Sequence, residues 1–256
     1  SGPLALCALY RELSKRKDRR FTYRFSVTAE TIGTIAFLSK RGKHLLSNLV
    51  AGYQLTCCGD RGPLTYKLSR RETSVADRAA RLVLRDLAKE GSDQHSVVPY
   101  DPAFGSDERQ WCSPGYNLPV GSLMRTMYAK YPEYHTSLDD KAFLSFPALA
   151  RTVRAYERIA DALEANVTWK NTVMFGEPQL GKRNLFRSLG AQTSYVDRDV
   201  SMWWLLNLCD GTRDLLAVAE QSKCSLGALA AVAQVLADHG LLVDVDAPRP
   251  KRKKRK

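Results

Sequence analysis

Apolar residues recur at the spacing of an amphipathic helix in several segments of the chain. Two of these segments carry a clear start signal, because Ser74 and Ser225 stand directly before the apolar run as N-cap residues. Gly240 ends the last segment. The pattern predicts helices over residues 4–13, from 31 to 38, and over 75–87, 146–163, 200–208, 215–221 and 226–239.

Short segments rich in β-branched and aromatic residues lie between these helices. The segment 20–28 alternates aromatic and polar residues and predicts a strand. Further strands are predicted at 49–58, 64–68, 96–100, 122–127 and 241–245, with turns at 59–63 and 210–212 and a long loop at 101–121. Strands that alternate with helices indicate an α/β sheet. Three helices followed by a short strand indicate a winged-helix fold.

The composition of the chain changes after residue 166. We therefore expect an α/β domain over residues 1–170, a linker over 171–195 and a winged-helix-like domain over 196–245. The remaining residues, 246–256, end in six consecutive Lys and Arg residues, which predicts a basic, disordered tail.

The formal net charge of +12 would by itself favour a nucleic-acid partner. Half of this excess lies in the last six residues, and a second basic cluster lies at 15–20. The candidate recognition helix at 226–239 carries no Lys or Arg, whereas a DNA-reading helix presents basic and amide side chains. We therefore expect the C-terminal domain to pack or to bind a protein partner, and we expect only weak, salt-sensitive nucleic-acid contact through the tail.

The cysteines and the hydropathy favour a cytoplasmic protein. None of the six cysteines forms a CxxC pair, and Cys57 and Cys58 are adjacent in an apolar run, as expected of reduced, buried thiols. There is no run of 18 apolar residues, so we expect no membrane span, and we see no signal-peptide pattern. The sequence begins with Ser1 rather than Met, and we expect it to be a fragment.

Three stretches carry side chains suited to a metal-dependent hydrolase. Glu30 follows the strand predicted at 20–28, at the sheet edge where α/β folds build their sites. The loop 105–115 holds adjacent carboxylates, and the stretch 131–139 holds His135 between acidic residues. Metal hydrolases use His and carboxylates to bind the ion and a free carboxylate to accept a proton from water.

Longer stretches carry a resemblance to a known family. They are AETIGTIAFLS (29–39), LTCCGDRGPLTYKLSRR (55–71), YDPAFGSDERQWCSPGYNLPVGSLMR (100–125), YPEYHTSLDD (131–140) and GEPQLGKR (176–183). The chain resembles the bacterial aminopeptidase-like proteins with a C-terminal winged helix, some of which are encoded among polysaccharide-biosynthesis genes. These belong to the zinc-exopeptidase superfamily of leucyl aminopeptidases and glutaminyl cyclases. The resemblance implies a partial three-layer zinc-exopeptidase-like sheet and a zinc-hydrolase ancestry.

The resemblance also assigns residues. Glu30 matches the general-base glutamate, and His135 matches the last zinc-binding histidine. Thr31 and Thr56 stand where the superfamily has acidic residues, which implies one zinc ion rather than two. Asp107 matches the aspartate of a Ser-Asp-His loop in which this chain has Glu instead of His. Residues expected to bind the substrate amine or to orient His135 are Asp107, Glu108, Arg109, Glu133, Tyr134 and Asp139; the alternative for the acids is a structural salt bridge with Arg109 or Arg125.

In the superfamily, a histidine and a bridging aspartate lie just before a Ser-Gly pair, and this sequence begins at that pair. Stable zinc sites need three or four ligands, so we expect this chain alone to be poor in metal and inactive. The leading hypothesis is a zinc-dependent aminopeptidase-like hydrolase of small peptide or amide substrates, incomplete here. The alternatives are a non-catalytic domain that retains the fold to bind a ligand or protein, and a nucleic-acid-binding regulator.

Overall fold

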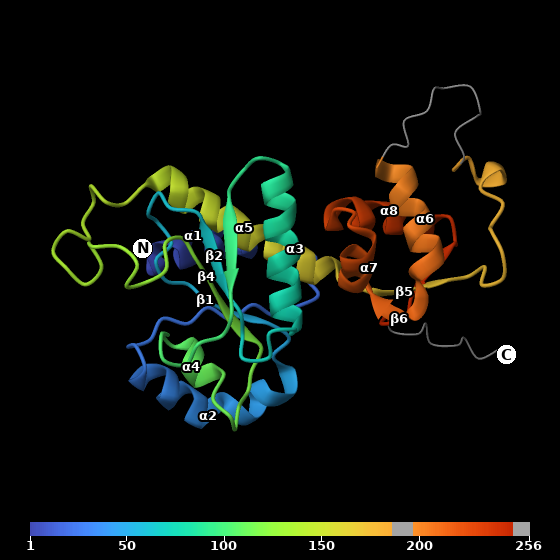
Figure 1. Ribbon diagram of the computed structural model, residues 1–256. Coiled ribbons are helices and arrows are strands. Elements are labelled where there is room, and N and C mark those ends of the chain that lie inside the picture. The colour runs from blue at the N-terminus through green and yellow to red at the C-terminus, as the bar shows by residue number, and fades with distance from the viewer. Residues whose placement is uncertain (186–196, 248–256) are drawn as a thin grey trace. The chain divides into compact units, whose positions relative to one another are not determined.

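The computed structural model describes residues 1–185 and 197–247, and the chain divides into two compact units, residues 1–164 and 165–256 (Figure 1). The second part of the linker expected at 171–195, from residue 186 onward, lies outside the described residues, and so does most of the tail expected at 246–256. The strand β5 (Thr168–Asn171) begins in the range expected for the first domain and ends at the first residue of the expected linker, and it pairs with strands of the second unit.

The first unit contains a mixed four-stranded sheet in the order β1-β4-β2-β3. Its strands are β1 (Gly52–Gln54), β2 (Leu64–Lys67), β3 (His95–Val98) and β4 (Val120–Met124). The pairs β1–β4 and β2–β3 are parallel, and β2–β4 is antiparallel. The helices of this unit are α1 (Gly2–Ser14), α2 (Ile32–Asn48), α3 (Val75–Lys89), α4 (Glu108–Trp111) and α5 (Phe146–Ala165).

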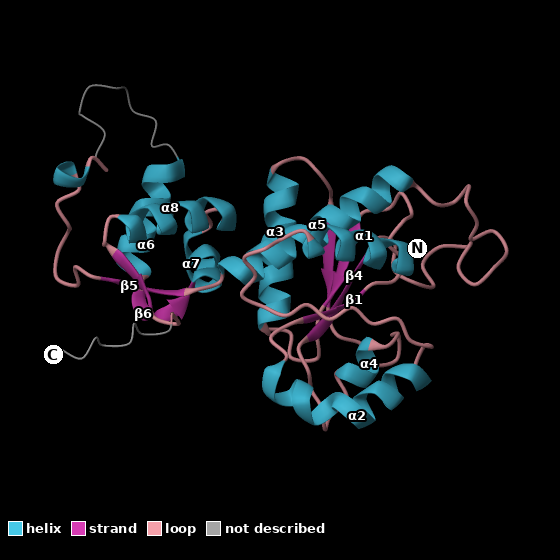
Figure 2. Cartoon of the chain, turned by 180° about the vertical axis from the view of Figure 1, so that it is seen from behind, coloured by secondary structure: helices cyan, strands magenta, loops and turns pink. Residues whose placement is uncertain are grey.

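Helices cover both faces of this sheet, which confirms the predicted three-layer α/β architecture (Figures 1 and 2). On one face, Tyr66 of β2 donates a hydrogen bond to Asp77 of α3, and Tyr156 of α5 donates one to the Leu123 carbonyl of β4. On the other face, Val120 packs against α2. Alternate residues of a strand point to opposite faces, so β4 serves both layers.

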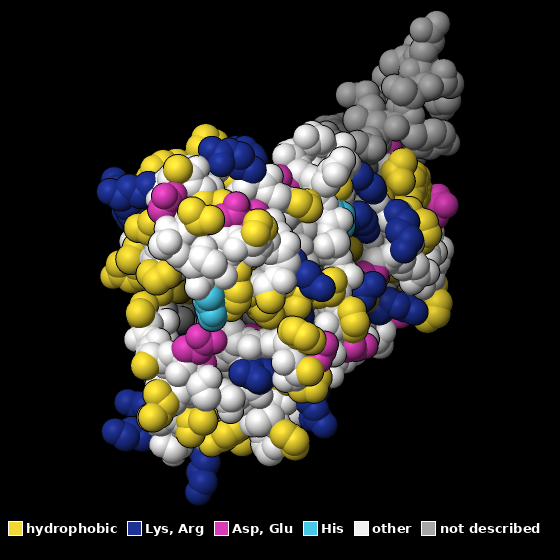
Figure 3. Space-filling model, turned by 60° about the vertical axis from the view of Figure 1, so that its left-hand side comes forward, with side chains coloured by type: hydrophobic (Ala, Val, Ile, Leu, Met, Phe, Trp, Pro, Cys, Tyr) yellow, Lys and Arg dark blue, Asp and Glu magenta, His cyan; other side chains and the backbone are white. Residues whose placement is uncertain are grey.

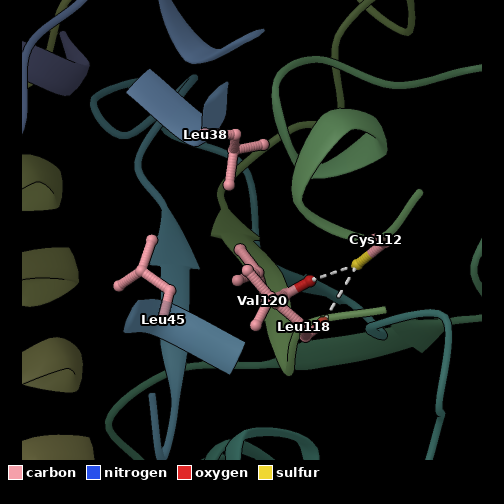
Figure 4. Close-up of a cluster of buried hydrophobic side chains, with 5 residues drawn as sticks. All are labelled: Leu38, Leu45, Cys112, Leu118 and Val120. Atoms are coloured by element: carbon pink, nitrogen blue, oxygen red, sulfur yellow. Dashed lines mark hydrogen bonds between the residues drawn. The ribbon is translucent and has the colours of Figure 1, made fainter. Parts of the chain in front are cut away.

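The layer formed by α2 and α4 is fixed by a small apolar cluster (Figure 4). Burial of each such side chain contributes about 1.5–3 kcal/mol. The Cys112 thiol donates to the carbonyls of Leu118 (3.5 Å) and Val120 (3.2 Å), so the chain after α4 is tied to β4. This anchoring matters for the site, because α2 begins just after Glu30 and α4 just after Ser106. The buried members of the cluster are Leu38, Leu45, Cys112, Leu118 and Val120.

The helix predicted at 75–87 is confirmed, together with its cap. The Ser74 side chain accepts from the Asp77 backbone N–H, and the Asp77 carboxylate accepts from the Ser74 backbone N–H, which completes a capping box. Asp77 is fully buried, and its carboxylate also accepts from Ser69 N–H and Oγ at 2.7 and 2.6 Å. One carboxylate thus starts α3 and holds the chain that leaves β2.

The strand predicted at 20–28 is wrong, because the structure has no regular strand there. The aromatic side chains of the segment do pack: Phe25 lies edge-on to Tyr10 of α1, with ring centroids 5.3 Å apart. The Phe21 N–H and the Tyr23 hydroxyl donate to the Glu164 carboxylate rather than to a neighbouring strand. The alternation matches the half-buried aromatic side chains at 21, 23 and 25, but a strand also needs a partner for its backbone.

The second unit is a winged-helix domain, as predicted. It contains α6 (Asp197–Leu208), α7 (Leu215–Ser222) and α8 (Leu226–Asp238), and a three-stranded antiparallel sheet in the order β6-β5-β7. The strand predicted near the C-terminus is β7 (Leu242–Asp244). The turn predicted at 210–212 is wrong: it forms part of β6 (Asp210–Asp214), where Gly211 adopts a φ of +89°. No helix in the described ranges is long and apolar enough to cross a membrane.

Candidate functional site

A cavity of about 270 Å³ in the first unit brings together residues from distant parts of the sequence. Four of its lining residues were predicted as site residues: Glu30, Tyr134, His135 and Asp139. The loop between β4 and α5, which extends to the left in Figure 1, supplies the last three. With that side turned forward, Figure 3 shows a histidine beside acidic and apolar side chains around a hollow.

Glu30 lies on the turn that leads into α2, and a neighbouring loop holds its side chain. The Ser106 hydroxyl donates to Glu30 Oε1 over 2.8 Å. The next residue, Thr31, adopts a φ of +61°, and its N–H donates to Asp107 Oδ1 over 2.6 Å. A left-handed conformation of a β-branched residue costs free energy and is kept only where its surroundings hold it. Asp107, which does not line the cavity, therefore holds the turn that carries Glu30.

The loop that carries Ser106 is itself held by a buried ion pair. Lys67 and Glu108 are both fully buried, and Lys67 Nζ lies 3.0 Å from Glu108 Oε1. Lys67 also donates to the Tyr128 hydroxyl (3.1 Å) and to the carbonyls of Asp101 (2.7 Å) and Phe104. The Ser106 N–H donates in turn to Glu108 Oε2 over 3.0 Å. Glu108 therefore supports the loop and does not line the cavity; its partner is Lys67 rather than Arg109 or Arg125.

Aromatic side chains form another part of the cavity wall. The His135 ring stacks on Tyr134 with centroids 3.9 Å apart, and His135 has a φ of +58°. Tyr131 stacks on Phe143 at 5.2 Å, and its hydroxyl lies 3.4 Å from the Cys57 thiol. Burial raises the pKa of Tyr134, and burial together with the Cys57 hydrogen bond raises the pKa of Tyr131. Both phenols therefore stay protonated at neutral pH.

The cavity carries an excess of negative charge. Glu30, Asp60 and Asp139 supply carboxylates, and no Lys or Arg lies among its lining residues. Asp60 is buried and accepts from Thr126 Oγ1 (2.6 Å) and the Gly62 N–H (2.8 Å). A pocket with three carboxylates and no lysine or arginine side chain favours ligands that carry a positive charge.

The remaining predicted residues lie outside the cavity lining. The Arg109 side chain donates to the Ser106 carbonyl over 3.4 Å, so it also supports the loop. The Glu133 carbonyl accepts from the Thr136 N–H and hydroxyl, and its carboxylate is not part of the wall. Arg125 pairs with Asp93 at 3.2 Å instead of with an acid of the site.

The residues of the cavity do not by themselves fit the zinc ion that the resemblance implies. Within residues 1–185 and 197–247, no group of three or more His, Cys, Asp or Glu side chains is arranged to bind a metal. Protein zinc sites use at least three such ligands. In this part of the chain, His135 is a single candidate ligand without a complete set.

Sequence reasoning missed several lining residues, among them Ser106, Cys57, Asp60 and Tyr131. Ser106 stands directly before the predicted Asp107, so the Ser-Asp match of the resemblance contained the signal. Cys57 directly follows Thr56, and its φ of +44° turns the chain at the cavity. Asp60 and Tyr131 lie in stretches that carry the resemblance, but the resemblance assigned them no role, and the fold brings them to this wall.

Residues 1–166 match the family model of DUF4910, described as a domain of unknown function. The chain belongs to this family. Residues 167–244 match a winged helix-turn-helix family. The DUF4910 match covers the whole cavity, since all of its lining residues lie between Ser1 and Leu144.

Two relatives of this DUF4910 chain come from Clostridium acetobutylicum. One is named "Putative polysaccharide biosynthesis protein with aminopeptidase-like domain"; it is 38% identical over 222 residues, which are 87% of this chain and 49% of the relative. The other is a crystal structure of a "putative peptidase", with 34% identity and a TM-score of 0.83, covering 94% of this chain and 52% of that one. The chain thus has a peptidase-like fold and spans about half the length of these relatives.

Proposed function

We propose that this chain forms part of an aminopeptidase-like hydrolase and that the cavity is its site for peptide or amide substrates. The observation that carries the proposal is the convergence of Glu30, His135 and Asp139 in one cavity without a lysine or arginine in its wall. The names of the relatives and the structural similarity support the same class of reaction.

The side chains of this cavity have clear tasks in such a reaction. Glu30 accepts a proton from a water molecule that attacks the substrate carbonyl and passes it to the leaving amine. Ser106 holds one carboxylate oxygen of Glu30, which orients the other for this transfer. Asp139 and Asp60 attract the positively charged amine of the substrate. Tyr134, kept protonated by burial, can donate a hydrogen bond to the substrate.

We also propose that the hydrolase depends on zinc. His135 would provide one ligand, and the others would come from outside the described residues, because these hold no complete set. The relatives are about twice as long as the matched region, which leaves room for such ligands in a longer protein. When bound, one zinc ion would lower the pKa of a water molecule toward ~7.

The test uses the protein extended to the length of its Clostridium relatives and measures hydrolysis of leucine amide. We expect Glu30→Gln to abolish turnover, while Glu133→Gln, whose side chain lies outside the cavity, retains it. N-acetyl-leucine amide should not be cleaved, because it lacks the amine that the acidic wall would bind. Equal turnover by wild type and Glu30→Gln would overturn the proposal.

A second candidate is a non-catalytic domain that uses the cavity to bind a small amine or peptide. The absence of a complete ligand set in the described part of the chain favours it. Saturable binding of leucine amide without turnover in the longer protein would support this function over the first.

For the winged-helix domain, we propose a protein partner rather than DNA, since α8 has no Lys or Arg. We propose a cytoplasmic location for the whole protein.

A further inference from the structure

A second cavity, of about 440 Å³, lies within the winged-helix unit. Its walls are the segment that follows β5 and the outer side of α6. The volume falls within the range of about 300–1,000 Å³ that is typical of small-molecule sites. None of its lining residues takes part in the cavity around Glu30.

Two indole rings dominate one wall. Trp203 and Trp204 are adjacent in α6, and both are half-buried and line the cavity. The core-facing side of the helix is occupied by Ser201, Met202 and Leu205, which are buried. Large aromatic side chains usually bury their rings in a core or an interface, so two neighbouring rings turned toward a cavity indicate a surface made to be covered.

The two walls are tied together. Asn171 Nδ2 donates to the Leu206 carbonyl of α6 over 2.7 Å, and Asn171 Oδ1 accepts from the Val173 N–H over 2.9 Å. This buried amide joins the end of α6 to the segment that carries Glu177. The cavity is therefore held open by the fold, as preformed ligand sites are.

The charge of the cavity is negative. Glu177 is its charged lining residue, and within the described ranges no ion pair involves its carboxylate. A cation over an indole face is attracted by the ring quadrupole, and the attraction grows when the cation is desolvated. The carboxylate of Glu177, which is exposed and lines the same cavity as the two indoles, adds a full opposite charge.

We propose that this cavity binds a monovalent organic cation, with an ammonium or quaternary ammonium group placed between Glu177 and the faces of Trp203 and Trp204. The remaining walls suit the alkyl part of such a ligand, because Pro178, Val200 and Leu206 also line the cavity. The site requires neither the basic tail nor a recognition helix, and it gives the winged-helix unit a small-ligand function that is independent of the proposed hydrolase.

The test is a tryptophan-fluorescence titration of the whole chain with choline. We expect saturable quenching by choline and no saturable change with its neutral isostere, in which carbon replaces the nitrogen. Glu177→Gln should weaken choline binding at least about tenfold, and Trp204→Leu should weaken it similarly. Trp111→Phe is the matched control, because Trp111 packs on Phe37 in the first unit and should leave the affinity unchanged.

Thermal unfolding of each variant is recorded in parallel, so that loss of binding is scored only on folded protein. The proposal is overturned if folded wild type shows no saturable response to choline, or if the neutral isostere binds equally well. Binding of a neutral sugar with an affinity that Glu177→Gln does not change would also overturn it, because a carboxylate selects for charge.

Discussion

The Ser106 hydroxyl donates a hydrogen bond to the Glu30 carboxylate over 2.8 Å, across 76 positions of sequence. It joins the loop supported by the Lys67–Glu108 ion pair to the strained turn at Thr31. The candidate base is thus held by a network that begins in the buried centre of the unit and ends in the cavity. Disturbing either end should have different and measurable consequences.

Replacing Ser106 by Ala removes this contact without touching the core. In the extended protein we expect the kcat for leucine amide to fall about ten- to a hundredfold, because the carboxylate loses its fixed orientation, while KM changes little. The free energy of unfolding should stay within about 0.5 kcal/mol of wild type. Ser113→Ala, on the other side of α4 and outside the cavity lining, is the control, and a drop in kcat for both variants would show that the effect is not specific to Ser106.

Replacing Lys67 by Met should act on stability instead. It leaves the fully buried Glu108 carboxylate without its counter-charge, which costs about 3–5 kcal/mol of unfolding free energy, measured by urea denaturation. The double variant Lys67→Met/Glu108→Leu removes both charges and should recover part of this loss. If the single and double variants lose the same free energy, the buried charge is not the cause.

Cys58 should make stability depend on alkaline pH. Burial raises the pKa of its thiol from 9.0 to about 12. The folded state therefore favours the neutral thiol, and this stabilisation is complete below pH 9.0 and lost as the pH rises toward 12, by at most about 1.4 kcal/mol per pH unit. Between these values, Cys58→Ala should show a shallower fall in unfolding free energy than wild type.

The exposed Cys7 provides the matched variant, Cys7→Ala, which should keep the slope of wild type. Cys209 of the second unit also has its pKa raised to about 12 by burial, so unfolding of the two units is followed separately. If the unfolding free energy of Cys58→Ala falls with pH as steeply as that of wild type, the buried Cys58 thiol is not the source of this pH dependence.

Local sequence patterns were sufficient for most of the fold. Periodicity and the Ser74 and Ser225 caps predicted α3 and α8, since those signals act within a few residues. The pairing of strands was harder to predict. The segment 20–28 has the composition of a strand but forms no backbone hydrogen-bond ladder, whereas β6 (Asp210–Asp214) pairs with β5 although its Asp-Gly sequence is typical of a turn. Strand formation depends on partners that are distant in sequence, and no local pattern contains them.

For the site, too, one part could be predicted from the sequence and another part depends on the packed structure. The resemblance singled out Glu30 and His135 as site residues, and the structure places both at one cavity. It did not reveal that Glu108 forms a buried ion pair with Lys67, or that Ser106 donates a hydrogen bond to Glu30. Such roles follow from which side of a loop faces the core, and only the packed structure decides that.

The most direct test of the hydrolase proposal is the zinc content of the purified protein, extended to the length of its Clostridium relatives, beside its His135→Ala and Glu30→Gln variants. We predict about one zinc ion per chain in wild type, a clear loss in His135→Ala, and full zinc without leucine-amide hydrolysis in Glu30→Gln. Absence of zinc from the extended wild type, together with hydrolysis that persists in Glu30→Gln, would contradict the proposal.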